Sequence, residues 1–177
     1  MSIKQFIRKG GFSTIYLMDN KYIVKQICND SYYNIEYTVA SKCENIPELN
    51  YCFKKKQDCY YTNLYFPYYS DGDLFDNLYN LCPLSEAEGK KYIKQMLSCI
   101  QILNNLNYVH LDIKLENFLV NNKNLVLSDF GSCHHINNKI CPVERRNIGT
   151  NNFLSPEIAN MSYHTTSDLW AIGVCMY

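Results

Sequence analysis

The chain has 177 residues, with 17 basic and 17 acidic side chains and a formal net charge of zero. This length suits one ordinary domain with a buried core. The balance of charge gives no general basic field, so we expect neither nucleic acid nor a lipid surface as a partner.

The nine cysteines include no C-x-x-C pair. An odd number without ligand spacing favours reduced thiols over a disulfide framework or a zinc site. No apolar run reaches membrane-spanning length, and residues 1–4 lack the apolar core of a signal peptide. These features predict an intracellular, cytoplasmic protein. The tyrosine- and asparagine-rich composition is typical of an AT-rich genome, such as that of a protist or a large DNA virus, and a viral chain would act in the host cytoplasm.

Two strands, at residues 3–7 and 14–18, are predicted on either side of a glycine-containing turn at 8–13. Backbone N–H groups in such a turn can approach phosphate groups. Taken alone, a turn of this kind is more often an ordinary hairpin.

A third strand is predicted at 22–27 and carries Lys25 in its interior. Apolar residues at helical spacing then predict a helix at 34–43, which carries Glu36. A strand lysine and a helical glutamate usually face solvent, so neither residue indicates a site on its own.

Two more strands are predicted at 49–53 and 60–66, with the lysine-rich segment 54–58 as a solvated hairpin tip between them. Pro67 lacks an N–H and cannot continue a central strand, so we expect the chain to leave the sheet there. Asp73 is the expected N-cap of a following helix.

Ser85 and Glu88 have the spacing of a capping box at the start of a longer helix. Apolar residues at helical spacing follow and predict a stripe that faces the core: Tyr92, Met96, Cys99, Ile100, Leu103 and Leu106.

The segment 110–117, with the sequence H-L-D-I-K-L-E-N, brings three different polar groups into one short turn. A carboxylate, an ammonium and an amide held close together suit phosphoryl transfer. Asp112 would accept a hydroxyl proton, Lys114 would neutralise a phosphoryl group and Asn117 would ligate a hard cation. The alternative is a plain polar turn between a helix and a hairpin.

Further motifs follow in order: D-F-G at 129–131, G-T at 149–150, S-P-E at 155–157 and D-L-W-A-I-G at 168–173. Together with segment 110–117 they resemble the signature set of the eukaryotic-type serine/threonine protein kinases. The corresponding family patterns are H-R-D-x-K-x-x-N, D-F-G, G-T…A-P-E and D-x-W-x-x-G. The resemblance runs from about residue 7 to the last residue.

The resemblance implies an α+β, bilobal protein-kinase-like fold. An antiparallel β-lobe with one helix would cover residues 1–66, a hinge residues 67–69, and a mainly helical, incomplete lobe residues 70–177. ATP would lie between the lobes. Because the chain ends at the start of the most buried helix of the large lobe, the resemblance also implies a truncated lobe. Three explanations stay open: a gene fragment, a pseudogene-like product, or a minimal form that a partner covers and completes.

The resemblance assigns chemical roles to four of the singled-out residues. Asp112 and Lys114 would be catalytic, and Asn117 and Asp129 would hold Mg²⁺. It also implies that His110 and Phe130 pack inside the protein, while Asp168 hydrogen-bonds the backbone of segment 110–117.

The resemblance also implies a set of nucleotide contacts. Lys25 would anchor the ATP phosphates, paired with Glu36 or, as the alternative, Glu44. The other residues expected to contact the nucleotide are Ile7, Gly10, Gly11, Ile15, Phe66 and Tyr68.

The chain departs from the family pattern in two places. In the glycine-rich loop only Gly10 fits cleanly, since Arg8 and Ser13 stand at the first and third glycine positions. Leu111 replaces the usual arginine, and residues 133–149 contain no Ser, Thr or Tyr. We therefore hypothesise that phosphorylation of this segment does not switch the activity of the protein.

Thr150 resembles the threonine of serine/threonine-specific kinases, which favours a Ser/Thr substrate over Tyr.

Three functions are consistent with these observations. The first is a Mg·ATP-dependent kinase that phosphorylates Ser/Thr residues of a protein substrate. The second is a catalytically weak or inactive kinase-like protein that binds nucleotide or acts as a scaffold, which the altered glycine loop favours. The third, a small-molecule kinase of the aminoglycoside or choline type, is disfavoured by the D-F-G and S-P-E motifs.

Overall fold

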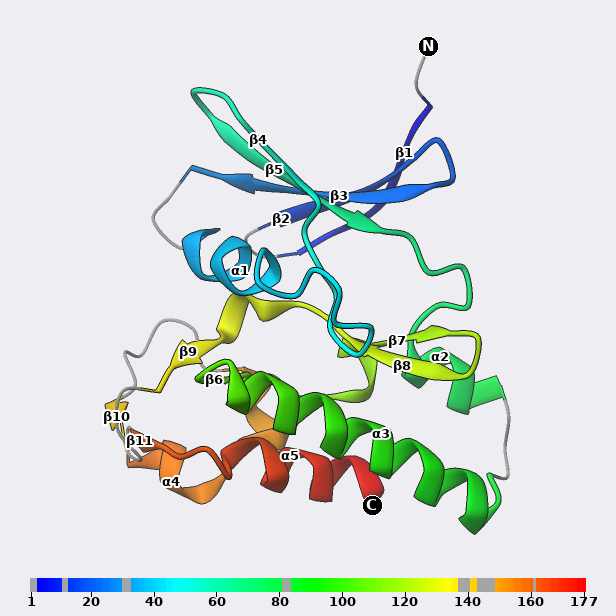
Figure 1. Cartoon of the computed structure of the whole chain (residues 1–177), viewed down its shortest axis with the longest axis vertical. Helices are drawn as coiled ribbons and strands as arrows, with labels where there is room; N and C mark the ends of the chain where they lie inside the picture. The colour runs from blue at the N-terminus through cyan, green and yellow to red at the C-terminus, as the bar shows by residue number, and fades with distance from the viewer. Residues whose placement is uncertain are drawn as a thin grey trace.

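The computed structural model describes residues 3–10, 13–29, 33–80, 84–136, 141–142, 149–160 and 162–177. A twisted sheet lies on one side of the molecule and a group of helices on the other (Figure 1). Chain segments that join the two halves pass through the region between them.

The sheet has five antiparallel strands in the order β1-β2-β3-β5-β4. Their bounds are β1 Lys4–Lys9, β2 Ser13–Met18, β3 Tyr22–Cys28, β4 Lys54–Gln57 and β5 Tyr61–Pro67. Helix α1 (Tyr33–Ala40) lies against the sheet on the side of the other helices (Figure 1). The central position of β3 places Lys25 between Ile15 of β2 and Leu64 of β5.

The rest of the chain is mainly helical. It contains α2 (Leu74–Asn80), α3 (Glu86–Asn105), α4 (Pro156–Ala159) and α5 (Ser167–Met176). Short antiparallel strand pairs connect the helices: β6 (Tyr108–Val109) with β9 (His134–His135), β7 (Phe118–Asn121) with β8 (Asn124–Leu127), and β10 (Cys141–Pro142) with β11 (Ser162–Tyr163). Single 3-10 turns lie at Leu115–Asn117, Phe130–Ser132 and Asn151–Phe153.

Helix α3 confirms the capping box expected at its start. Ser85 N–H donates to Glu88 Oε2 at 3.1 Å, and Glu88 N–H donates to Ser85 Oγ at 3.3 Å. These bonds satisfy backbone donors that the first helical turn leaves free. The expected apolar stripe is also present, with four of its residues fully buried: Met96, Cys99, Ile100 and Leu103.

The strand expected at 49–53 is wrong, and the lysine-rich segment is itself strand β4. The start of the earlier segment bonds outside the five-stranded sheet: Leu49 forms an isolated parallel bridge with Leu127, and Asn50 N–H donates to Leu127 C=O at 2.8 Å. Its last residue, Phe53, donates its N–H to Tyr65 C=O of β5 at 3.1 Å. The lysines form the edge strand instead, where charged side chains face water and discourage pairing with another sheet. Strand β5 ends at Pro67, one residue beyond the expected boundary.

One hydrophobic cluster continues from the underside of the sheet into the helices. It includes Leu64 of β5, Val39 of α1, Met96 of α3 and Phe130. Within the part of the chain that the structure describes, no helix is both long and apolar enough to cross a bilayer.

The packing predicts which thiols react. Cys43 and Cys99 are fully buried, and this burial raises the pKa of each thiol to about 12, whereas Cys28 and Cys59 are exposed. Because the thiolate is the reactive form, iodoacetamide at pH 8 should label the exposed pair in the native protein and the buried pair only after unfolding. Peptide mass spectrometry measures both. Equal labelling of all four before unfolding would contradict this packing.

Candidate active site

Lys25 lies between two carboxylates from distant parts of the chain. Its Nζ is 2.7 Å from Glu36 Oε1 and 2.7 Å from Asp129 Oδ1. The side chains of Lys25 and Glu36 are almost buried, at 13% and 5% exposure, whereas that of Asp129 is 37% exposed. The ammonium group of Lys25 therefore joins strand β3 to helix α1 and to Asp129, which lies shortly after β8. The pairing is with Glu36 and not with Glu44, the alternative that the sequence left open.

Burial and charge act in opposite directions on these groups. Burial favours neutral Lys25, but the carboxylates of Asp129 and Glu36 outweigh it and raise the pKa of Lys25 above its usual range. The ammonium of Lys25 in turn holds the pKa of Asp129 well below its usual range. Burial raises the pKa of Glu36, against the effect of Lys25. The outcome at neutral pH is a charged lysine with an ionised and accessible Asp129.

The segment 110–117 folds into a compact loop in which Asp112 collects four donors. Lys114 Nζ donates to Asp112 Oδ2 at 2.9 Å, and Asn117 Nδ2 donates to the same oxygen at 3.1 Å and to Asp112 C=O at 2.7 Å. The N–H and hydroxyl of Thr150 both donate to Asp112 Oδ1, each at 2.8 Å. Lys114 Nζ also contacts Thr150 Oγ1 at 2.9 Å. The carboxylate is therefore fixed in orientation on both sides.

Asp168, at the start of α5, hydrogen-bonds the backbone of this loop. Its two buried oxygens accept the backbone N–H groups of His110 and Leu111 at 2.8 and 2.9 Å. Leu111 has a φ of 62°, a left-handed conformation that costs energy for a leucine. The paired hydrogen bonds to Asp168 stabilise the loop in this conformation, which is the role that the resemblance implied for Asp168.

The buried His110 ring connects the loop to the segment that carries Asp129. Its Nδ1 accepts the N–H of Asp112 at 3.3 Å, and its Nε2 lies 3.1 Å from Ser128 C=O. A neutral ring with its proton on Nε2 satisfies both contacts. The ring also packs edge-on against Phe130, with centroids 5.8 Å apart. His110 and Phe130 therefore pack inside the protein as the resemblance implied.

Asn117 and Asp129 are linked through Ser128. Asn117 C=O accepts both the N–H of Ser128, at 2.9 Å, and its hydroxyl, at 3.0 Å. Asp129 then turns sharply, with a φ of 63°. Among the described residues, Asn117 Oδ1 and Asp129 Oδ2 have no hydrogen-bond partner. No group of three or more His, Cys, Asp or Glu side chains that could hold a metal ion occurs within the same described ranges.

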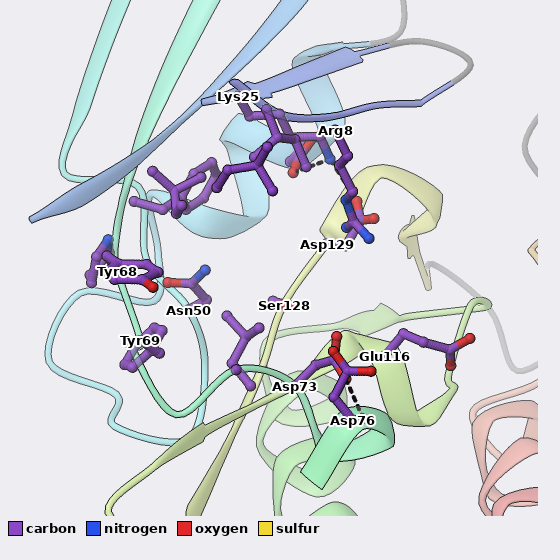
Figure 2. Close-up of a pocket in the computed structure, with 18 residues that line it drawn as sticks. Arg8, Lys25, Asn50, Tyr68, Tyr69, Asp73, Asp76, Glu116, Ser128 and Asp129 are labelled. Carbon is purple, nitrogen blue, oxygen red and sulfur yellow. Dashed lines mark hydrogen bonds and ion pairs between the residues drawn. The ribbon is translucent and has the colours of Figure 1, made fainter. Parts of the chain in front are cut away.

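A cavity of about 470 Å³ opens beside this network. Figure 2 shows Lys25, Arg8 and Asp129 at one end, and Tyr68, Tyr69 and Asn50 at another. Strands β1, β2 and β3 contribute an apolar wall of Ile7, Ile15 and Ile23. The opposite wall carries Gly72, Asp73, Asp76, Glu116, Leu119 and Ser128. The cavity thus has a charged end and a largely apolar, aromatic end.

The structure brings most of the predicted site residues together. Six of them line the cavity besides Asp129: Ile7, Ile15, Lys25, Glu36, Phe66 and Tyr68. Asp112, Lys114 and Asn117 form the adjoining network without lining the cavity itself. Gly10 does not line it either, and Gly11 lies outside the described residues.

Two residues that matter to this site were not predicted from the sequence. Asn50 lines the cavity although it lies in a segment predicted as a strand, and no local pattern marks it. Gly149 allows a contact that a side chain would block, because a Cβ there would be 2.1 Å from Leu111 C=O and 2.8 Å from Asp112 Oδ1. In the G-T pair at 149–150, the sequence indicated a role for Thr150 and none for Gly149.

Comparison with known proteins gives one family and several relatives. The family model described as "Protein kinase domain" matches residues 4–177. Serine/threonine-protein kinase MRCK beta of Rattus norvegicus is 36% identical over 147 residues, which are 78% of this chain and 8% of the relative. Myosin light chain kinase A of Dictyostelium discoideum is 30% identical over 194 residues, 98% of this chain and 64% of the relative. The chain spans less than two thirds of the length of either relative.

The crowding at Gly149 predicts the effect of a single methyl group. Gly149→Ala would push the Thr150 segment away from Asp112, so we expect a loss of about 1–3 kcal/mol in the free energy of unfolding. Gly173→Ala is the matched control, because nothing lies within 4 Å of a Cβ at that position of α5. Alanine there should be neutral or stabilising by up to about 1 kcal/mol. Urea unfolding of the two variants measures both changes, and equal stability would contradict the close approach of the two segments.

Proposed function

The chain belongs to the protein kinase family, and we propose that it transfers the γ-phosphate of ATP to a Ser or Thr hydroxyl of a protein substrate. The observation that carries this proposal is the network around Asp112, which joins Lys114, Asn117 and Thr150 next to the Lys25–Asp129 pair. Phosphoryl transfer needs these parts: a group that orients the hydroxyl, positive charge for the phosphates and oxygen ligands for a cation. The serine/threonine preference rests on Thr150 and on the names of the relatives.

The cavity suits a nucleotide with its base at the aromatic end and its phosphates at Lys25. Phe66, Tyr68 and the isoleucines of the β-strands supply apolar surface for a base. The backbone N–H groups of Tyr68 and Tyr69 have no hydrogen-bond partner among the described residues, so they can donate to the edge of the base. Residues 67–69 would then act as the hinge between a lobe at 1–66 and a lobe at 70–177.

The free oxygens of Asn117 and Asp129 fit Mg²⁺. This ion prefers oxygen ligands and is commonly held by one or two side chains together with phosphates and water. When bound, it would neutralise charge on the phosphates. Gly10, directly after β1, would approach the phosphates from the turn that follows this strand.

The orientation of Asp112 supports a role as proton acceptor. As the substrate oxygen bonds to the γ-phosphorus, the bond from that phosphorus to the β,γ-bridging oxygen would break and ADP would leave. The hydroxyl proton would pass to Asp112, which the bonds from Thr150 hold in one orientation. Lys114 already contacts the same carboxylate and can extend to a phosphoryl oxygen. Its charge then stabilises the transferring group.

A second candidate function is nucleotide binding without efficient catalysis. It is favoured by Arg8, which lines the cavity and points toward Asp129 in Figure 2. Its guanidinium contributes to the lowered pKa of Asp129. A cation near Asp129 would compete with a metal ion for the same carboxylate, which would weaken transfer without preventing nucleotide binding.

Radioactive phosphate transfer to a basic protein substrate tests the proposal. We expect Mg²⁺-dependent transfer by the wild type and a loss of about 100-fold or more in kcat for Asp112→Asn. Asp129→Asn should be inactive as well, because the metal loses a charged ligand. Glu86→Gln is the control for the same chemical change, since Glu86 is an exposed residue of α3 that pairs with Lys90 on the same helix. Transfer that survives Asp112→Asn would contradict the role of Asp112, and ATP binding by an inactive wild type would support the second function.

The packing of Leu111 bears on regulation by phosphorylation. Leu111 is 4% exposed and packs in an apolar cluster with Val109, Ile158 and Tyr163. Apolar contacts therefore hold this part of the structure. Leu111 has no cationic group that could bind a phosphate. We expect phosphatase treatment to leave kcat unchanged.

The variant Leu111→Arg tests this apolar packing of Leu111. A guanidinium would disrupt the apolar contacts with Val109, Ile158 and Tyr163, so the melting temperature should fall, whereas Leu111→Met should be tolerated. Thermal unfolding measures both variants. Mapping of a phosphate to Ser132 or Thr150, which flank residues 133–149, together with a gain in activity would contradict the hypothesis.

A further inference from the structure

Asn50 has a buried amide without a partner among the described residues. The residue is 6% exposed, and its Oδ1 is buried with no hydrogen bond in that part of the chain. No hydrogen bond of its Nδ2 occurs within the described ranges either, and only the Oδ1 of this amide is among the fully buried unpaired atoms. Its backbone is fixed by the bond from its N–H to Leu127 C=O at 2.8 Å. A buried polar group costs free energy unless it is satisfied, so a ligand or water is needed to complete this site.

The amide faces the cavity at the end that would take the base. Asn50 lines the cavity together with Phe66, Tyr68 and Ser128. Figure 2 shows it near Tyr68 and Tyr69, away from Lys25 and Asp129 at the charged end. Three buried polar side chains line the cavity: Glu36, Asn50 and Ser128. Glu36 accepts from Lys25 Nζ, and Ser128 donates its hydroxyl proton to Asn117 C=O at 3.0 Å. Asn50 is therefore the one of the three whose amide donor is free for a ligand.

We propose that Asn50 determines base specificity by forming two hydrogen bonds to the N6/N7 edge of adenine. This inference rests on the proposed nucleotide-binding function and goes beyond it. An asparagine amide offers one acceptor and one donor side by side, which match the N6–H donor and N7 acceptor of adenine. Guanine presents two acceptors, O6 and N7, on the same edge. Asn50 Oδ1 would then face another acceptor and stay unsatisfied, so the site should reject guanine.

Calorimetric titration with three nucleotides tests the assignment. The ligands are ATP, GTP and 7-deaza-ATP, in which carbon replaces the N7 acceptor. We expect the wild type to bind ATP about 10-fold or more tightly than GTP, and about 3- to 10-fold more tightly than 7-deaza-ATP. The comparison of ATP with 7-deaza-ATP needs no variant, so it remains informative whatever a substitution does to folding.

Asn50→Leu removes the amide while nearly preserving its shape. We expect weaker ATP binding, a preference for ATP over GTP that falls severalfold, and no remaining difference between ATP and 7-deaza-ATP. Because the amide has no partner to lose among the described residues, the melting temperature should stay the same or rise. Asn104→Leu is the control, since Asn104 also has a buried Oδ1 without a described partner but lies on α3 and does not line the cavity. It should keep the wild-type nucleotide preferences.

The outcomes separate this inference from the proposed function. Equal wild-type affinity for ATP and 7-deaza-ATP, or an unchanged ATP-to-GTP ratio in Asn50→Leu, would overturn the role of Asn50 and leave nucleotide binding intact. A folded wild type that binds none of the three nucleotides would overturn both.

Discussion

The double ion pair of Lys25 is the interaction on which the site depends. A lysine this deeply placed needs opposite charge nearby, because desolvation of the ammonium costs several kcal/mol. Glu36 and Asp129 supply that charge from helix α1 and from the segment after β8, at 2.7 Å each. The sheet, the helix beneath it and the segment after β8 are therefore held in one arrangement. Loss of either carboxylate would leave a poorly compensated charge and loosen the contact between the two halves.

A second set of contacts gathers three loop segments around Asp112. Asp168 fixes the backbone at His110 and Leu111, Ser128 bonds to Asn117, and Thr150 bonds to Asp112. Each bond joins residues that are well separated in sequence, so the geometry depends on the whole fold. Because the carboxylate of Asp112 has donors on both oxygens, the fold itself sets its direction. In the proposed function, such preorganisation would lower the cost of orienting groups during the reaction.

Local patterns in the sequence predicted elements whose contacts are local. The capping box of α3, the strand that carries Lys25 and the helix that carries Glu36 all follow from periodicity and capping. The family resemblance gave the pairing of Lys25 and the anchoring role of Asp168. The segment 49–53 was misassigned because its apolar residues suit a strand, whereas Asn50 N–H donates to Leu127 C=O and Cys52 N–H to Ala40 C=O, which only the completed fold brings near. Asn50 and Gly149 were missed for the same reason, since burial and crowding arise only when distant segments meet.

The two departures from the family pattern act on different parts of the site. Leu111 replaces a cation with apolar packing, so the loop around Asp112 is held by Asp168 and by the cluster with Ile158 and Tyr163. This arrangement needs no added charge to form. Arg8 instead adds a cation at the charged end of the cavity, near Asp129. The first departure is therefore absorbed into the packing around Asp112, whereas the second changes the charge near Asp129.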